Sequence, residues 1–120
     1  MSLFCKLFSF GVILPLVCGF DAHADNIYVS DYGAGTIETF DSSGNESVFA
    51  SNLDDPAGLA FDGSGNLYVA NSGSGTIEKF NSIGSESVFA SGLNDPTGIS
   101  FDESGNLYVA DSGGGTIEKI

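Results

Sequence analysis

The 120-residue sequence predicts an all-β fold built from repeated four-stranded antiparallel sheets, and three observations lead to this prediction. A phrase that opens at Asn26 returns at Asn66 and Asn106, and 25 of the 40 positions are identical in the two complete units. Each unit holds short runs rich in Val, Ile, Phe and Tyr, bounded by Gly, Asp, Asn and Ser, as expected for strands joined by tight turns. The runs follow one another too closely for crossover helices, so neighbouring strands should be antiparallel. A period of this length is typical of the blade of a β-propeller.

The repeat divides the chain into two complete units, residues 26–65 and 66–105, and a partial unit, residues 106–120. The strands expected in one full period are residues 58–61, 67–70, 76–80 and 87–90. Counted along the chain, this pattern predicts ten strands, or about two and a half blades. Propellers need about four to eight blades to close, so the sequence predicts an incomplete ring.

The residues of each run predict its place in the blade. Residues 67–70 are apolar on both faces of their strand, which predicts a central strand covered on both sides. Leu59 and Phe61 alternate with small residues, as expected for the innermost strand beside a crowded axis. Residues 76–80 carry a glutamate and a lysine and are expected to be more exposed, and residues 87–90 should form the outer edge.

The first 24 residues are typical of a secretory signal peptide. Lys6 precedes an apolar run at residues 7–17, and the small residues Ala22 and Ala24 lie just before Asp25. The apolar run is short for a membrane span, although an uncleaved anchor is the alternative. We therefore expect a secreted or periplasmic protein whose repeat domain covers residues 25–120.

The charge balance excludes several classes of partner. Lys and Arg together number 3 and Asp and Glu 16, for a formal net charge of −13. Such a chain cannot build the basic patch that a nucleic acid or an anionic lipid surface requires. Residues 25–120 also contain no Cys, His, Arg, Met or Trp, so they offer no disulfide, and only carboxylates, Ser, Thr, Tyr and two lysines remain for catalysis.

A family resemblance rests on the phrase PAGLAFDGSGNLYVAN at residues 56–71 and its near copy at residues 96–111. The phrase resembles the NHL repeat of β-propellers, which is related to the SMP-30/gluconolactonase-like group, and the resemblance extends over residues 26–120. It implies a propeller fold. Thr36, Thr76 and Thr116 stand where many NHL repeats have arginine, so no basic recognition surface is expected.

Five polar residues are candidate metal ligands at one end of the predicted propeller. Asp31, Asn71 and Asp111 follow the second strand of each unit, and Asp55 and Asp95 precede the prolines. Both loop types should emerge at the channel mouth, where gathered carboxylates would suit calcium. The resemblance to metal-dependent gluconolactonase-like propellers points the same way. The alternative, which we favour, is a solvated acidic rim of turn residues, because the set recurs in every unit.

A second acidic pattern is better explained by turns. Asp62 and Asn66, like Asp102 and Asn106, bracket short Gly-containing loops that superficially resemble a calcium loop. The glycine and glutamate positions of a calcium-binding EF-hand loop are not matched. We therefore predict hairpin turns in which the Asp and Asn side chains satisfy backbone groups.

An incomplete ring leaves three explanations: a fragment of a longer chain, which we favour, an oligomer such as a homodimer that completes the ring, or an open stack that binds a partner. The sequence predicts a non-catalytic binding or scaffold module for a protein or small ligand, with no catalytic or cofactor-binding residue. The alternative function is a calcium-dependent gluconolactonase-like hydrolase completed by missing blades or a second chain. Family lyases that rely on histidine do not fit.

Overall fold

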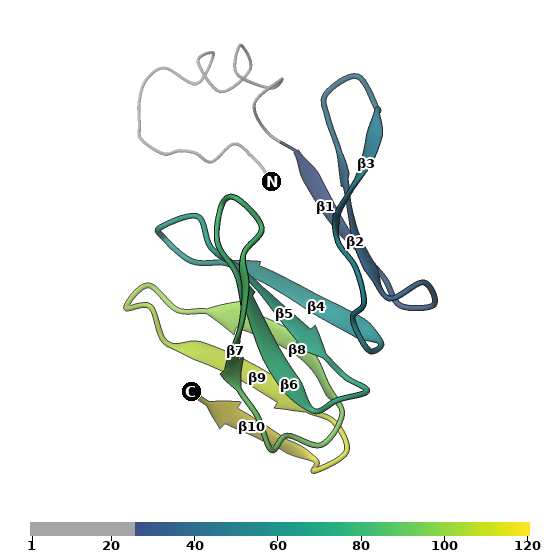
Figure 1. The fold of residues 1–120 in the computed structure, drawn as a ribbon. Helices are drawn as coiled ribbons and strands as arrows, with labels where there is room; N and C mark the ends of the chain where they lie inside the picture. The colour runs from purple at the N-terminus through teal and green to yellow at the C-terminus, as the bar shows by residue number, and fades with distance from the viewer. Residues whose placement is uncertain (1–25) are drawn as a thin grey trace.

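The computed structural model describes residues 26–120, which fold into three antiparallel β-sheets (Figure 1). The predicted all-β fold is confirmed, and none of the described residues belongs to a helix long and apolar enough to cross a membrane. The predicted signal peptide at residues 1–24 lies outside the described part of the chain.

The three sheets follow the 40-residue repeat. The first sheet has the order β1 (Ile27–Asp31), β2 (Thr36–Phe40), β3 (Glu46–Ala50). The second has the order β4 (Pro56–Phe61), β5 (Leu67–Asn71), β6 (Thr76–Phe80), β7 (Glu86–Ala90). The third has the order β10 (Thr116–Lys119), β9 (Leu107–Asp111), β8 (Pro96–Phe101). All seven strand pairs are antiparallel, as predicted.

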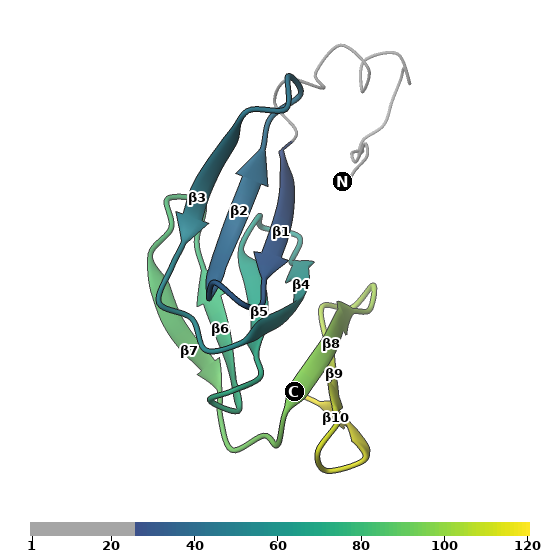
Figure 2. The same cartoon turned by 90° about the vertical axis from the view of Figure 1, so that its right-hand side faces the viewer.

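The sheets stand one after another, with the four-stranded sheet in the middle (Figures 1 and 2). Among residues 26–120, the first sheet has no strand at the innermost position of a full blade, and the third has none at the outermost. Residues 26–120 therefore form an arc of a propeller, in agreement with the predicted two and a half blades.

The hydrophobic core is divided into two layers, one at each joint between sheets. Leu67 and Val69 of β5 face the first sheet and pack with Ile37 of β2. Tyr68 and Ala70, on the opposite face of β5, pack with the third sheet. The prediction that this strand is central and apolar on both sides is confirmed, because every residue of β5 is buried.

The strand β4 lies beside β8, where the inner strands of neighbouring blades meet. A methyl group placed on Gly58 of β4 would overlap the backbone carbonyl oxygen of Thr97 in β8. The small residues that alternate with Leu59 and Phe61 thus allow the close approach expected near the propeller axis.

One strand prediction is wrong. We expected β6 to be exposed, but Ile77, Glu78 and Phe80 are buried. The reason is the position of β6, which is third of four strands and is covered on both faces by neighbouring sheets. Thr76 Oγ1 donates to Glu78 Oε1 at 2.7 Å, which compensates part of the cost of burying this carboxylate. The outer strand β7 is exposed along most of its length, as predicted.

Candidate functional site

The candidate site lies at the end of the arc where two kinds of loop meet. Loops that follow the second strand of a blade contact the loops that precede the innermost strand. The backbone amide of Asp54 donates to Asn71 Oδ1 at 2.7 Å, and one repeat later the amide of Asn94 donates to Asp111 Oδ1 at 2.6 Å. The amide of Ser72 also donates to the carbonyl oxygen of Asp55 at 3.1 Å. These bonds hold the two loops of each blade together at one end.

The candidate ligands that follow the second strands therefore serve as backbone anchors. Asn71 accepts the Asp54 amide and also donates from Nδ2 to Ser74 Oγ at 2.9 Å. Asp31 belongs to the sheet without an innermost strand, and its Oδ1 accepts the amide of Ala34 within its own turn at 3.0 Å.

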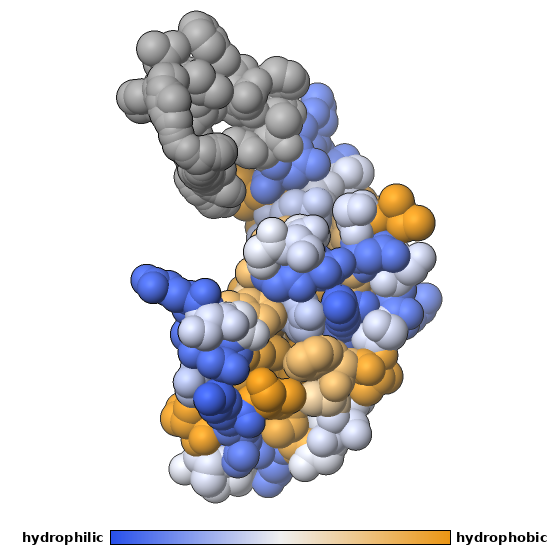
Figure 3. All heavy atoms as spheres, turned by 90° about the vertical axis from the view of Figure 1, so that its left-hand side faces the viewer, coloured by the Kyte–Doolittle hydropathy of each residue, from blue (hydrophilic) through white to orange (hydrophobic). Residues whose placement is uncertain are grey.

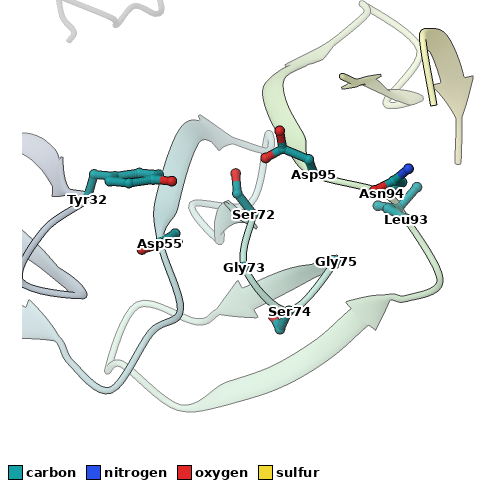
Figure 4. A pocket seen from close by; sticks show the side chains of 9 residues that line it. All are labelled: Tyr32, Asp55, Ser72, Gly73, Ser74, Gly75, Leu93, Asn94 and Asp95. Carbon is teal, nitrogen blue, oxygen red and sulfur yellow. The ribbon is translucent and has the colours of Figure 1, made fainter. Parts of the chain in front are cut away.

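A pocket of about 250 Å³ opens between the loops of all three sheets (Figure 4). Its lining residues are Tyr32, Asp55, Ser72, Gly73, Ser74, Gly75, Leu93, Asn94 and Asp95. Tyr32 comes from the first sheet, residues 72–75 from the β5–β6 loop, and residues 93–95 from the loop before β8. Of the five predicted site residues, Asp55 and Asp95 line the pocket, and the structure places the other three outside its lining.

Sequence reasoning missed Tyr32, although a signal was present. The repeat has serine at the two equivalent positions, Ser72 and Ser112, so tyrosine marks a departure from the repeat. Figure 4 shows the Tyr32 ring extending toward Asp55 and Ser72. A residue that breaks an otherwise regular repeat is a better guide to a local site than one that recurs in every unit.

The backbone at the two pocket carboxylates has an unusual conformation. Asp55 has φ of 56° and Asp95 has φ of 61°, in the left-handed region that Asp and Asn tolerate better than most residues. Each residue directly precedes the buried proline that begins an innermost strand. The hydroxyl of Ser72 donates to the carbonyl oxygen of Pro96 and ties the β5–β6 loop to the next blade.

The electrostatics of the pocket centre on Tyr32. The negative charge of Asp55 raises the pKa of the Tyr32 phenol above its ordinary value of 10.0, with smaller contributions from burial, a hydrogen bond to Asp55, and the charges of Asp95 and Asp54. The phenol therefore stays protonated at neutral pH.

A calcium ion takes six to eight oxygen ligands, which carboxylates, carbonyl groups and waters supply. Within residues 26–120, no three acidic, His or Cys side chains come close enough together to hold a metal ion. Asn71 and Asp111 also have a side-chain oxygen engaged by a backbone amide. The five-residue calcium rim stays a prediction, and ligands from outside the described residues would be needed to complete it.

The opposite end of the arc carries the predicted Asx turns. Asp62 Oδ1 accepts the backbone amides of Ser64 and Asn66 at 2.9 Å, and Asp62 Oδ2 accepts Asn66 Nδ2 at 2.9 Å. The same bonds recur at Asp41 and Asp102. These side chains are engaged with their own turns, as the turn interpretation predicted.

The fold and the repeat are those of a β-propeller, and a comparison with known protein families identifies the kind of repeat. The NHL repeat model matches residues 53–80 and 93–120. The chain therefore carries two NHL repeats, which confirms the resemblance noted in the sequence. A search of curated protein sequences found no match.

Solved structures of propeller proteins share the fold. The chain matches virginiamycin B lyase from Staphylococcus aureus with a TM-score of 0.66 and 14% identity, over 78% of this chain and 36% of the lyase. It matches an auxiliary nutrient binding protein from Bacteroides ovatus with a TM-score of 0.67 and 14% identity, over 79% of this chain and 34% of that protein. A putative gluconolactonase matches with a TM-score of 0.51 and 22% identity, over 62% of this chain and 28% of that protein. The chain spans about a third of the length of the first two structures.

Proposed function

We propose that this chain is a secreted or periplasmic, non-catalytic binding and scaffold module that captures a cationic group at its acidic loop end. The observation that carries the proposal is the pocket whose lining brings Tyr32, Asp55 and Asp95 together. Loops from three sheets build this pocket, so the stacked blades act as the scaffold and the loops as the binding surface.

The charge of the pocket favours a cationic partner. Three carboxylates lie near enough to one phenol to raise its pKa, and the whole chain carries a formal net charge of −13. A negative surface of this kind attracts an ammonium or guanidinium group over several ångströms, and the pocket carboxylates can then accept its hydrogen bonds. The Tyr32 ring adds an aromatic surface at the same place.

The chemistry of the lining residues favours binding over catalysis. Residues 26–120 contain no His, Cys or Arg. The Ser72 hydroxyl donates to the carbonyl oxygen of Pro96, and the raised pKa of Tyr32 keeps its phenol protonated. The Ser72 hydroxyl is therefore engaged by a backbone carbonyl, and the Tyr32 phenol is held in its protonated, weakly nucleophilic form. The likeness to a nutrient binding protein supports a fold that serves binders as well as enzymes.

The proposal can be tested with a fluorescent pentalysine peptide as the probe. Fluorescence anisotropy of the full chain should show binding that weakens as salt is raised. The double variant Asp55→Asn and Asp95→Asn should weaken binding by about fivefold, because two partly exposed ion pairs together contribute on the order of 1 kcal/mol. Asparagine is compatible with the left-handed backbone at both positions, so the fold should be retained.

The matched control is the double variant Glu46→Gln and Glu86→Gln. It removes the same amount of charge from the exposed start of β3 and β7, far along the strands from the pocket. If binding falls equally in both double variants, the loss comes from the lower net charge alone. This result would contradict a binding site at the pocket. A wild-type chain that does not bind the peptide at low salt would contradict the proposal as a whole.

A calcium-dependent gluconolactonase-like hydrolase is the second candidate function. Its support is the pair of carboxylates, Asp55 and Asp95, that line the pocket, together with the fold shared with a putative gluconolactonase. Under this proposal, further ligands come from outside residues 26–120 and complete a calcium site that activates water.

A further inference from the structure

Within the part of the chain that the structure describes, the two outer sheets of the arc each have an exposed apolar face. On the first sheet, Ile27 is 59% exposed and Val29 is 41% exposed. On the third sheet, Ile117 is 71% exposed. Figure 3 shows exposed apolar side chains gathered in the lower half of one face of the molecule. Faces of this kind mark interaction surfaces in soluble proteins.

We name these two faces by their residues. The head face is the side of the first sheet that carries Ile27, Val29 and Phe40. The tail face is the side of the third sheet that carries Tyr108, Ala110 and Ile117. Strand alternation assigns these members to one side of their sheet, in agreement with the packing of the equivalent residues in the middle sheet.

The chain itself shows how a head face and a tail face pack together. At the joint between the second and third sheets, Leu107 and Val109 pack in one cluster with Tyr68, Ala70 and Ile77. All five side chains are buried. The corresponding cluster at the joint between the first and second sheets contains Ile37, Leu67 and Val69, the equivalents of Ile77, Leu107 and Val109 one repeat earlier.

The free faces carry the two halves of this same joint. Ile27 and Val29 occupy the repeat positions of Leu107 and Val109, with one conservative change. The three tail-face residues are identical to Tyr68, Ala70 and Ile77 at their repeat positions. A tail face set against a head face from a second copy would thus reproduce a joint that the chain already forms twice.

Charge supports the same pairing. Lys119 lies on the side of β10 that carries Ile117, and Glu38 lies on the side of β2 that carries Phe40. A tail face therefore brings a cation to a face that holds a carboxylate. A head face set against another head face would instead bring two Glu38 carboxylates together, which is unfavourable.

We propose that two copies of this chain associate head to tail, so that the tail face of each copy covers the head face of the other. Two identical heterologous joints then close a ring of six sheets. Six blades lie within the range in which propellers close. This association is independent of the cation binding proposed above, since the pocket residues lie on neither face.

The first experiment measures the molar mass of the full chain by size-exclusion chromatography with light scattering, in about 150 mM salt to screen the net charge. We expect twice the mass of one chain. Ile117→Glu on the tail face and Val29→Glu on the head face should each weaken the dimer by about a hundredfold, because each buries an unpaired charge at both joints.

The control variant is Ile83→Glu. Ile83 is 85% exposed in the β6–β7 turn and lies on neither face, so this variant should stay dimeric. Circular dichroism and thermal melting check that all three variants fold. A monomeric wild-type chain at high concentration, an open polymer, or loss of the dimer in Ile83→Glu would overturn the proposal.

Mixing the two face variants tests the head-to-tail geometry directly. The Ile117→Glu chain keeps an unchanged head face, and the Val29→Glu chain keeps an unchanged tail face. An equimolar mixture can form one intact joint, so it should form heterodimers at concentrations where each variant alone is monomeric. A dimer that joins like faces would leave one of the two variants fully dimeric, and this result would refute the proposed geometry.

Discussion

Gly58 and Gly98 occupy the same repeat position in the inner strands β4 and β8, but their surroundings differ. A methyl group on Gly58 would overlap the carbonyl oxygen of Thr97 in the neighbouring inner strand. A methyl group on Gly98 would meet only the Ala110 side chain, at an ordinary distance of 3.8 Å. Neither glycine has a positive φ, so the difference arises from the close approach of β8 to β4 and not from the local backbone.

This difference predicts the effect of adding one methyl group at each position. Gly58→Ala should lower the free energy of unfolding by about 1–3 kcal/mol, the usual cost of overpacking. Gly98→Ala should change the free energy of unfolding by less than about 0.5 kcal/mol, or raise it slightly because alanine lowers the conformational entropy of the unfolded chain. Urea unfolding followed by circular dichroism measures both. Equal losses at the two sites would show that the inner strands do not approach as described.

At the scale of the element, the Asx turns are the most regular feature of the chain. Hydrogen bonds from Asn45 hold the pKa of Asp41 below its ordinary value of 3.8, and those from Asn106 do the same for Asp102. For Asp62, burial alone would raise the pKa, but hydrogen bonds from Asn66, Ser64 and Tyr68 outweigh it and the pKa is lowered. Asn81 makes the two equivalent backbone bonds with an uncharged side chain in the β6–β7 turn.

These lowered pKa values predict acid sensitivity. A carboxyl whose folded pKa lies below its unfolded value stabilises the fold at neutral pH, and the contribution is lost as the pH falls below about 4 through the folded pKa. The triple variant Asp41→Asn, Asp62→Asn and Asp102→Asn should therefore lose less melting temperature than the wild type between about pH 5 and pH 2. It should still form the turns, as Asn81 does.

Thermal melts at a series of pH values measure this effect. The control is Glu103→Gln, which removes a carboxylate from the same β8–β9 turn without removing the Asp102 bonds. An acid transition that is unchanged in the triple variant would show that the turn carboxylates do not carry the pH dependence.

At the scale of the whole molecule, calcium distinguishes the two candidate functions. Any cation that binds the folded chain and not the unfolded chain must raise the melting temperature. Because residues 26–120 bring no metal-binding group of three ligands together, we expect the full chain to melt at the same temperature, within about 1 °C, in millimolar calcium and in chelator. Magnesium at the same ionic strength controls for screening of the net charge. A rise specific to calcium would favour the hydrolase proposal instead.

The fold was predictable because its signals are local and repeated. Alternating apolar residues, the Asp and Asn turn residues and the fixed period act over a few residues each, and together they predicted the strands, the turns and the central position of β5. The exposure of β6 was predicted wrongly because the prediction relied on the charged residues Glu78 and Lys79. The position of β6 as the third of four strands, between two neighbouring sheets, decides its burial instead. Burial at Glu78 depends on neighbouring sheets that no local pattern reveals.

The amino-acid sequence by itself determined the blade, its strand order and its Asx turns, since all of these depend on residues close together in the chain. Only the tertiary structure decided which residues form the pocket, because Tyr32, Asp55 and Asp95 come from three different sheets and meet through the stacking of blades. It also decided which apolar faces stay uncovered, because Ile27 and Ile117 have the same residue character as buried positions one repeat away. Identical side chains differ in exposure here because burial depends on which sheet stands next to them.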